Sequence, residues 1–435
     1  MSGLVTRSRL LSLLSEACEL EHALACSYLY AAFSIKRELA EGIDWVTQQR
    51  NRRWASQIYH VAAQEMLHLG QAWNLLTAIG GTPYYARPNF PLAARHYPLN
   101  VALVLRPLDL ATLDRFKYYE TPAHNDGGVS PPMPAAAAWP IDESFPYTSV
   151  GQLYGEVRRL VEALDEADLF IRDPGSQVGG DLVDFPDIVP VVDRTSAVAG
   201  IERITLQGVG TTEHRQDSHY GVFRDIHAQL AELPPGDGVA RPVAENPFVR
   251  RRRDQIPAAT FEVEGGGRHE IRTTEVTDPL AVLALDLFDD VYVSMLQALA
   301  YLFVNAGTGS RLVGVAAQAS LELMTTVIKP LGEAICLLPS GQPGVNAGPT
   351  FAMSRHTYLP GPEVASRTVY GDRIRELAGH ADALTQAAAS APWVARNQLR
   401  GAAANLARIA GWFAPGADRP VVGAPGAAAP RPGIA

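Results

Sequence analysis

Three ionisable residues stand at apolar positions of two long helical patterns near the start of this 435-residue chain. Glu21 occupies a stripe position between Ala17 and Leu24. Glu65 and His68 occupy successive positions of the next stripe. Because residues on one stripe share a helix face, these side chains are expected to point into a helical core. A buried carboxylate without a partner costs several kcal/mol as a rough scale, so the pattern calls for a bound cation or ion pairs.

Hydrophobic periodicity along the first half of the chain predicts four long helices. They are expected over about 7–40, 53–79, 150–171 and 197–232, with an interruption of the last near Gly208 and Gly210. The proline-rich segment 82–148 shows no helical period and connects the second and third helices. This order predicts a mainly α protein in which residues 1–235 form a four-helix bundle with 82–148 as a long crossover insertion.

The second half of the chain predicts a linker over 236–278, with a hairpin around Gly265-Gly266-Gly267, and a C-terminal helical region over 279–414. Helices are expected over about 279–305, 310–337 and 363–413. The most apolar stretch, 313–339, carries two glutamates, a lysine and a glutamine, so we expect a buried helix and no membrane span. The tail over 415–435 is rich in Pro, Gly and Ala and is expected to be disordered.

The charge balance argues against a nucleic-acid partner. The chain has 46 acidic and 37 basic residues and a formal net charge of −9, whereas nucleic-acid binding requires a basic surface. The run Arg250–Arg253 is interpreted as a solvated linker, with phosphate binding as the less favoured alternative. Three widely spaced cysteines form no disulfide framework or zinc motif, and no apolar leader is present. We therefore expect a cytoplasmic protein.

A glutamate on one helix and Glu-x-x-His on the next make half of a di-iron carboxylate pattern. The other half is expected from the third and fourth helices. Glu156 on the third helix is a candidate ligand, although its position beside Arg159 fits a surface residue equally well. On the fourth helix, His219 shares an apolar stripe, whereas Glu213 lies in a polar run that favours solvent. The competing interpretation of the first half is a Glu-x-x-His pair that is merely solvated.

Several segments resemble a bacterial ferritin-like family named for the iminophenylpyruvate dimer synthase of violacein biosynthesis. The resemblance covers residues 7–232. It is carried by the following segments: Glu19-Leu-Glu21-His22, Tyr28-Leu-Tyr30-Ala-Ala-Phe-Ser-Ile-Lys36, Glu65-Met-Leu-His68, Asn74-Leu-Leu-Thr-Ala-Ile-Gly-Gly-Thr-Pro83 and Ser218-His219-Tyr220. Two positions depart from the family, because Gln152 and Val209 stand where it tends to have glutamates. Glu156 and Glu213 are the candidate substitutes; without them the remaining residues would support one metal ion instead of two.

The resemblance implies a ferritin-like, non-haem iron oxidase or oxygenase of secondary metabolism, acting on an amino-acid-derived or aromatic small molecule. It implies one or two iron ions, with manganese as the alternative metal. Glu21 and Glu65 would neutralise the metal charge, His68 and His219 would be terminal ligands, and Tyr28 or Tyr154 would line the pocket. The expected partner is the small-molecule substrate, without nucleic acid or membrane, and a homodimer is left open.

The main alternative belongs to a different class: a metal-depleted ferritin-like scaffold or binding module that partners another biosynthetic enzyme. The missing glutamates at positions 152 and 209 favour it. Iron storage is a third hypothesis, and it is less favoured because some 200 residues form a second helical region.

Overall fold

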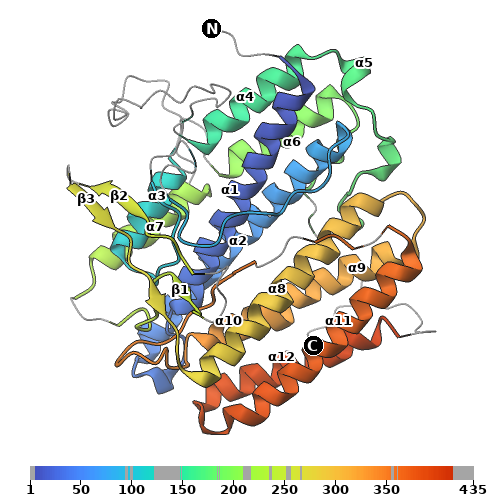
Figure 1. Ribbon diagram of the computed structural model, residues 1–435. Helices are drawn as coiled ribbons and strands as arrows, with labels where there is room; N and C mark the ends of the chain where they lie inside the picture. The colour runs from blue at the N-terminus through green and yellow to red at the C-terminus, as the bar shows by residue number, and fades with distance from the viewer. Residues whose placement is uncertain are drawn as a thin grey trace, which may run out of the picture.

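The computed structural model is mainly helical, with two short pairs of strands (Figure 1). It describes the following residues: 5–93, 97, 101–121, 147, 149–183, 185, 187–208, 217–234, 238–250, 256–264, 267–353, 357–359 and 361–414. The predicted fold class, a mainly α protein with a helical bundle, a long crossover and a second helical region, is confirmed. The predicted tail over 415–435 lies outside the described residues.

The first two helices, α1 (Arg7–Ser34) and α2 (Trp45–Ala78), pack along each other and form the centre of the molecule. The Thr6 side chain caps α1, and the Asp44 side chain accepts a hydrogen bond from the Thr47 N–H at the start of α2. The second helix therefore begins eight residues earlier than the expected 53. The sequence pattern missed these turns because they are mostly polar and carry no apolar stripe.

The other two bundle helices are each built from two pieces. The pieces are α4 (Val150–Ala163) with α5 (Glu166–Leu169), and α6 (Arg194–Gln207) with α7 (His219–Ala231). The fourth helix stops at Gly208, where an interruption was expected, and resumes at His219 behind a Ser218 cap. The break makes His219 the first helical residue of α7.

The crossover segment contains a helix that its composition did not predict. Helix α3 (Leu110–Tyr119) begins behind an Asp109 cap and packs against α7. The expectation that 82–148 lacks helical structure is therefore wrong for this part. Residues Leu113 and Phe116 are buried and supply a short apolar stripe that the surrounding prolines obscured.

The C-terminal helices form a layer beside the α1–α2 pair, drawn in yellow to red in Figure 1. Helix α8 packs against α2, and α10 packs against α1. The elements are α8 (Pro279–Asn305), α9 (Arg311–Glu322), the π-helical segment η4 (Leu323–Ile328), α10 (Lys329–Ile335), α11 (Glu363–Ala387) and α12 (Trp393–Gly411). The helix expected over 310–337 is thus present but contains a π-helical turn.

Short strands and 3₁₀ turns lie in the connections. Strand β1 (Pro247–Phe248) pairs in parallel with β4 (Thr274–Glu275). Strand β2 (Phe261–Glu264) pairs antiparallel with β3 (Gly267–Glu270), which forms the hairpin expected around residue 265. The 3₁₀ turns are η1 (Leu39–Glu41), η2 (Pro174–Ser176) and η5 (Ala388–Ser390).

Among the described helices, one stretch has the length and apolarity of a membrane span. It is Arg311–Ile335, with a mean hydropathy of 1.2, and 56% of its most apolar window is buried inside the protein. Core helices of soluble proteins share these properties, so this alone is weak evidence for a membrane.

Glu333, which belongs to this stretch, forms two ion pairs. Its partners are Arg37, which lies between α1 and η1, and Lys329, and both N–O distances are 2.7 Å.

We predict that the Glu333 ion pairs stabilise the fold in a pH-dependent way. Burial alone raises the pKa of Glu333, but Arg37 and Lys329 outweigh it and lower the pKa to about 2. Since this pKa is below the unfolded value, the stabilisation is complete above about pH 4.5 and is lost toward pH 2. Glu333→Gln should cost about 3 kcal/mol at pH 7 and about 1 kcal/mol at pH 3.

Urea unfolding of both proteins across this pH range measures the difference. Glu162→Gln, at an exposed glutamate on α4, is the control and should change stability little at either pH. A cost for Glu333→Gln that is independent of pH would contradict the prediction.

Candidate metal centre

Five ionisable side chains from four helical elements meet inside the bundle. Glu21 comes from α1, Glu65 and His68 from α2, Glu120 from the residue that caps the end of α3, and His219 from the start of α7. None of the five is more than 3% exposed. Three carboxylates therefore share a site without access to bulk water, which is costly unless positive charge accompanies them.

The five side chains form two groups of potential ligands that share Glu65. In the first group, His68 Nδ1 lies 3.5 Å from Glu21 Oε2 and 3.3 Å from Glu65 Oε2. In the second, His219 Nδ1 lies 2.7 Å from Glu65 Oε1 and 3.7 Å from Glu120 Oε1. Glu65 thus presents one carboxylate oxygen to each group, which is the arrangement that a bridging carboxylate requires.

Two glutamine side chains orient the histidines. His68 Nε2 lies 3.1 Å from Gln207 Oε1, and His219 Nε2 lies 3.1 Å from Gln64 Oε1. An amide oxygen only accepts, so each Nε2 carries the hydrogen and each Nδ1 faces the carboxylates. A histidine that ligates a metal is commonly held by such a hydrogen bond from its other ring nitrogen.

The pKa values of Glu21, His68 and His219 are all shifted in the direction that adds positive charge to the centre. Burial, followed by the negative charge of Glu65, raises the pKa of Glu21 to about 8. Burial alone lowers the pKa of His219, but Glu65 and Glu120 outweigh it and raise the pKa to about 9. The pKa of His68 is likewise raised, because Glu21 and Glu65 outweigh its burial. Protons supply the missing charge, and metal cations would supply it in their place.

Donor chemistry and unsatisfied atoms at the centre also fit a metal. Carboxylate oxygen with imidazole nitrogen is a ligand set suited to iron and manganese. Within the described part of the chain, Glu21 Oε1 and the Tyr154 hydroxyl are buried without a hydrogen-bond partner. Both groups line a cavity of about 10 Å³ beside Glu65, His68 and Glu120. A cavity of this size holds about one water molecule and excludes an organic substrate.

Four of the predicted ligands, Glu21, Glu65, His68 and His219, are brought together by the structure. Glu156 is not, because it lies on another face of α4, where Arg159 Nε is 2.6 Å from its carboxylate and Arg9 is 3.4 Å away. The hydrogen bond from Arg159 lowers the pKa of Glu156, which identifies the residue as an ion-pair partner.

The remaining positions singled out in the sequence are placed differently. Glu213 and Val209 lie outside the described residues. Gln152 is partly exposed in the first turn of α4, and the small cavity is instead lined by Gly151 and Tyr154 of the same helix. The third helix therefore contributes a tyrosine to the site and no described carboxylate.

Glu120 is the residue that sequence reasoning missed. It follows Leu113 and Phe116 at spacings of three and four, which is the same signal that identified Glu65 and His68. The Tyr28 hydroxyl donates a short hydrogen bond to Glu120 Oε1 and holds its carboxylate toward His219. A carboxylate from the crossover thus completes the second group of ligands.

A helical bundle that encloses carboxylates and histidines on facing helices is the architecture of the ferritin-like class. Residues 14–228 match the family model described as Ferritin-like, so this part of the chain is similar to a ferritin-like domain. The resemblance stated from the sequence motifs is confirmed.

Two characterised relatives are similar over most of this chain. Dichlorochromopyrrolate synthase of Lentzea aerocolonigenes is 29% identical over 420 residues, which cover 86% of this chain and 38% of the relative. The 2-imino-3-(indol-3-yl)propanoate dimerase of Chromobacterium violaceum is 27% identical over 414 residues, which cover 88% of this chain and 37% of the relative. The chain thus spans little more than a third of the length of either enzyme.

A solved structure of a ferritin-like protein from Caulobacter vibrioides aligns with 73% of this chain and 96% of its own length. It is 20% identical, with a TM-score of 0.43.

We predict that Glu120 is a ligand and that Glu156 is not. Glu120→Gln keeps the shape of the side chain but removes the charge, so metal content should fall by about one ion per chain. Glu156→Gln is the matched control, because it makes the same chemical change on a buried glutamate outside the centre. Inductively coupled plasma mass spectrometry of both purified variants gives the content. Equal metal content in Glu120→Gln and the unchanged protein would exclude Glu120 as a ligand.

Proposed function

We propose that this chain is a non-haem iron oxidase or oxygenase domain that acts on an amino-acid-derived or aromatic small molecule in secondary-metabolite biosynthesis. The observation that carries the proposal is the pair of buried carboxylate–histidine groups that share Glu65. The presence of two such groups of potential ligands favours two metal ions over one, with iron as the metal and manganese as the alternative.

Each of the five side chains has a role in this proposal. Glu65 would bridge, Glu21 and His68 would complete one site, and Glu120 and His219 would complete the other. Bound iron would supply redox chemistry toward dioxygen or peroxide. The protein's own contribution is to exclude bulk water, to hold both histidines by their Nε2 atoms, and to keep three carboxylates close enough to balance cationic charge.

Two tyrosines extend the centre. Tyr28 donates its hydroxyl hydrogen to Glu120, so it fixes the orientation of that carboxylate. Tyr154 places an unpartnered hydroxyl at the small cavity, where it is available to a bound water or ligand. Burial first, and then the neighbouring carboxylates, raise the pKa of both tyrosines, so both stay protonated and act as hydrogen-bond donors.

The relatives support the class of substrate. The names of both describe the enzymatic production of small molecules, and the second specifies dimerisation of an imino acid that bears an indole. Because this chain spans little more than a third of either relative, we extend only the general class of substrate to it.

The metal-depleted scaffold is the competing hypothesis. A scaffold without metal has no use for three buried carboxylates, and apolar replacements of similar volume are often neutral or stabilising at such positions. The retention of five oriented ionisable groups therefore favours a metal enzyme. A metal-free protein after purification and after incubation with ferrous iron under argon would favour the scaffold.

We predict that Glu65→Ala abolishes iron binding, because it removes the carboxylate common to both groups. Metal analysis should show a fall from about two ions per chain to less than about 0.2. The iron-loaded protein should change its optical spectrum on exposure to oxygen, and the variant should not.

The control is Glu162→Gln, which removes an exposed glutamate and should keep the full metal content. Circular dichroism establishes whether Glu65→Ala retains its helices. A folded Glu65→Ala variant with unchanged iron content would overturn the assignment of the centre.

A further inference from the structure

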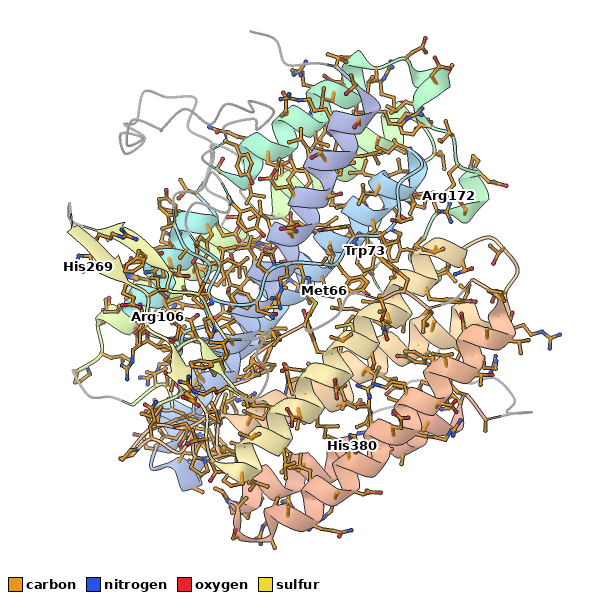
Figure 2. The ribbon with its side chains drawn as sticks, in the orientation of Figure 1. Met66, Trp73, Arg106, Arg172, His269 and His380 are labelled. Atoms are coloured by element: carbon orange, nitrogen blue, oxygen red, sulfur yellow. The ribbon has the colours of Figure 1, made fainter. Side chains whose placement is uncertain are left out.

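A second and much larger cavity lies between the α1–α2 pair and the C-terminal helices. Its volume is about 640 Å³, within the range of small-molecule sites. From α1 and α2 it is lined by residues such as Leu29, Ala63 and Met66, and from α8 and η4 by Met295 and Met324. None of the five residues of the metal centre lines it. Figure 2 labels Met66, which lies on α2 next to the C-terminal layer.

One part of this cavity is apolar and adaptable. Three methionines, Met66, Met295 and Met324, meet there with Leu321 and Phe185. Methionine side chains adjust to irregular shapes, and their sulfur atoms make favourable contacts with aromatic rings. This wall suits the flat apolar body of a small molecule.

The polar part of the lining is organised around Glu333. Its carboxylate pairs with Arg37 and Lys329, and it accepts hydrogen bonds from the Tyr59 hydroxyl at 2.7 Å and from Gln398 Nε2 at 2.8 Å. Four donors thus converge on one carboxylate, and two of them carry full positive charge.

Two polar atoms in this region remain unsatisfied. Arg37 Nε and Gln398 Oε1 are buried, and each lacks a hydrogen-bond partner in the described part of the protein. Both side chains line the cavity. A buried N–H without a partner is uncommon, and a bound hydrogen-bond acceptor would satisfy Arg37 Nε, whereas the Gln398 amide oxygen requires a donor such as water.

The balance of charge identifies the sign of that group. Four cationic residues line the cavity and only two acidic ones, Glu38 and Glu333. Glu333 neutralises one of its two cationic partners, so Arg37 and Lys329 together retain positive charge. A ligand carboxylate placed here would compensate that charge and accept from Arg37 Nε.

The wall of the cavity also contains the irregular turn of the C-terminal region. Met324, Thr325 and Ile328 belong to the π-helical segment η4 and line the cavity. Such turns lie frequently at functional sites, because the widened helix redirects side chains at the cost of regular hydrogen bonding. The position of η4 is therefore a second, independent indication of a ligand site.

We propose that this cavity binds an aromatic carboxylate, with the ring against the three methionines and the carboxylate beside Arg37 and Lys329. The site is separate from the metal centre, since α1 and α2 present different faces to the two. The proposal does not depend on metal binding or on the reaction proposed above.

The test uses two probes of the same shape, 1-naphthylacetate and the neutral 1-naphthylacetamide, titrated into the full chain by isothermal calorimetry. The acid should bind one per chain and at least about tenfold more tightly than the amide. Removal of metal with a chelator should leave both affinities within about twofold. Failure of the acid to bind, equal affinities for the two probes, or loss of binding on chelation would overturn the proposal.

Variants locate the site. Lys329→Gln should weaken acid binding about fivefold and leave amide binding unchanged, because Lys329 is 42% exposed and its removal leaves the Arg37–Glu333 pair. Ala63→Phe fills the cavity from α2 and should weaken both probes at least about tenfold. The control is Arg311→Gln, which removes an exposed cation that lines a different hollow. An equal effect of Lys329→Gln and Arg311→Gln on acid binding would place the acid elsewhere.

Discussion

The centre of this protein depends on the contacts of the Glu65 carboxylate with two histidines. One of its oxygens faces His219 on α7 and the other faces His68 on its own helix, so a single buried side chain connects α2 with α7. Burial makes this arrangement costly by itself, and the costs are offset only when every charged neighbour has a partner. The α1–α2 pair, the break in the fourth helix and the helix in the crossover all serve that requirement.

The break between α6 and α7 is one of the features that bring partners to the buried charges. It places His219 at the first position of α7, directly after the Ser218 cap. The end of α6 still contributes, because Gln207 holds His68 from the last residue of that helix. Helix α3 packs against α7 and brings Glu120 to within 3.7 Å of His219.

The sequence predicts those parts of the centre that depend on one helix at a time. Glu21, Glu65, His68 and His219 each stand on an apolar stripe, and stripe positions determine burial whatever the helix packs against. Glu120 obeys the same rule, but its stripe is only three residues long and is flanked by prolines and loop residues. Glu156 is a candidate from the sequence because the hydrophobic pattern of α4 predicts a helix but not the orientation of that helix in the bundle. Tertiary packing determines which face of α4 meets α1, and it is this packing that brings Glu156 next to Arg9.

The large cavity lies beyond sequence reasoning for the same reason. Met66 and Met324 are more than 250 positions apart, and neither shows anything unusual within its own helix. The packing of α2 against α8, and of α8 against η4, brings both residues to the lining of one cavity.

The α1–α2 pair separates two compartments with different polar side chains. The inner one gathers three carboxylates with two histidines, whereas the outer one gathers four cationic side chains with two carboxylates. Adjacent residues of α2 serve both, since Glu65 faces the inner compartment and Met66 the outer one. The inner volume of about 10 Å³ has room for about one water molecule or ion, whereas the outer volume of about 640 Å³ lies within the range of small-molecule sites. If both proposals hold, the same two helices would separate a cation site from an organic-anion site by charge and by size.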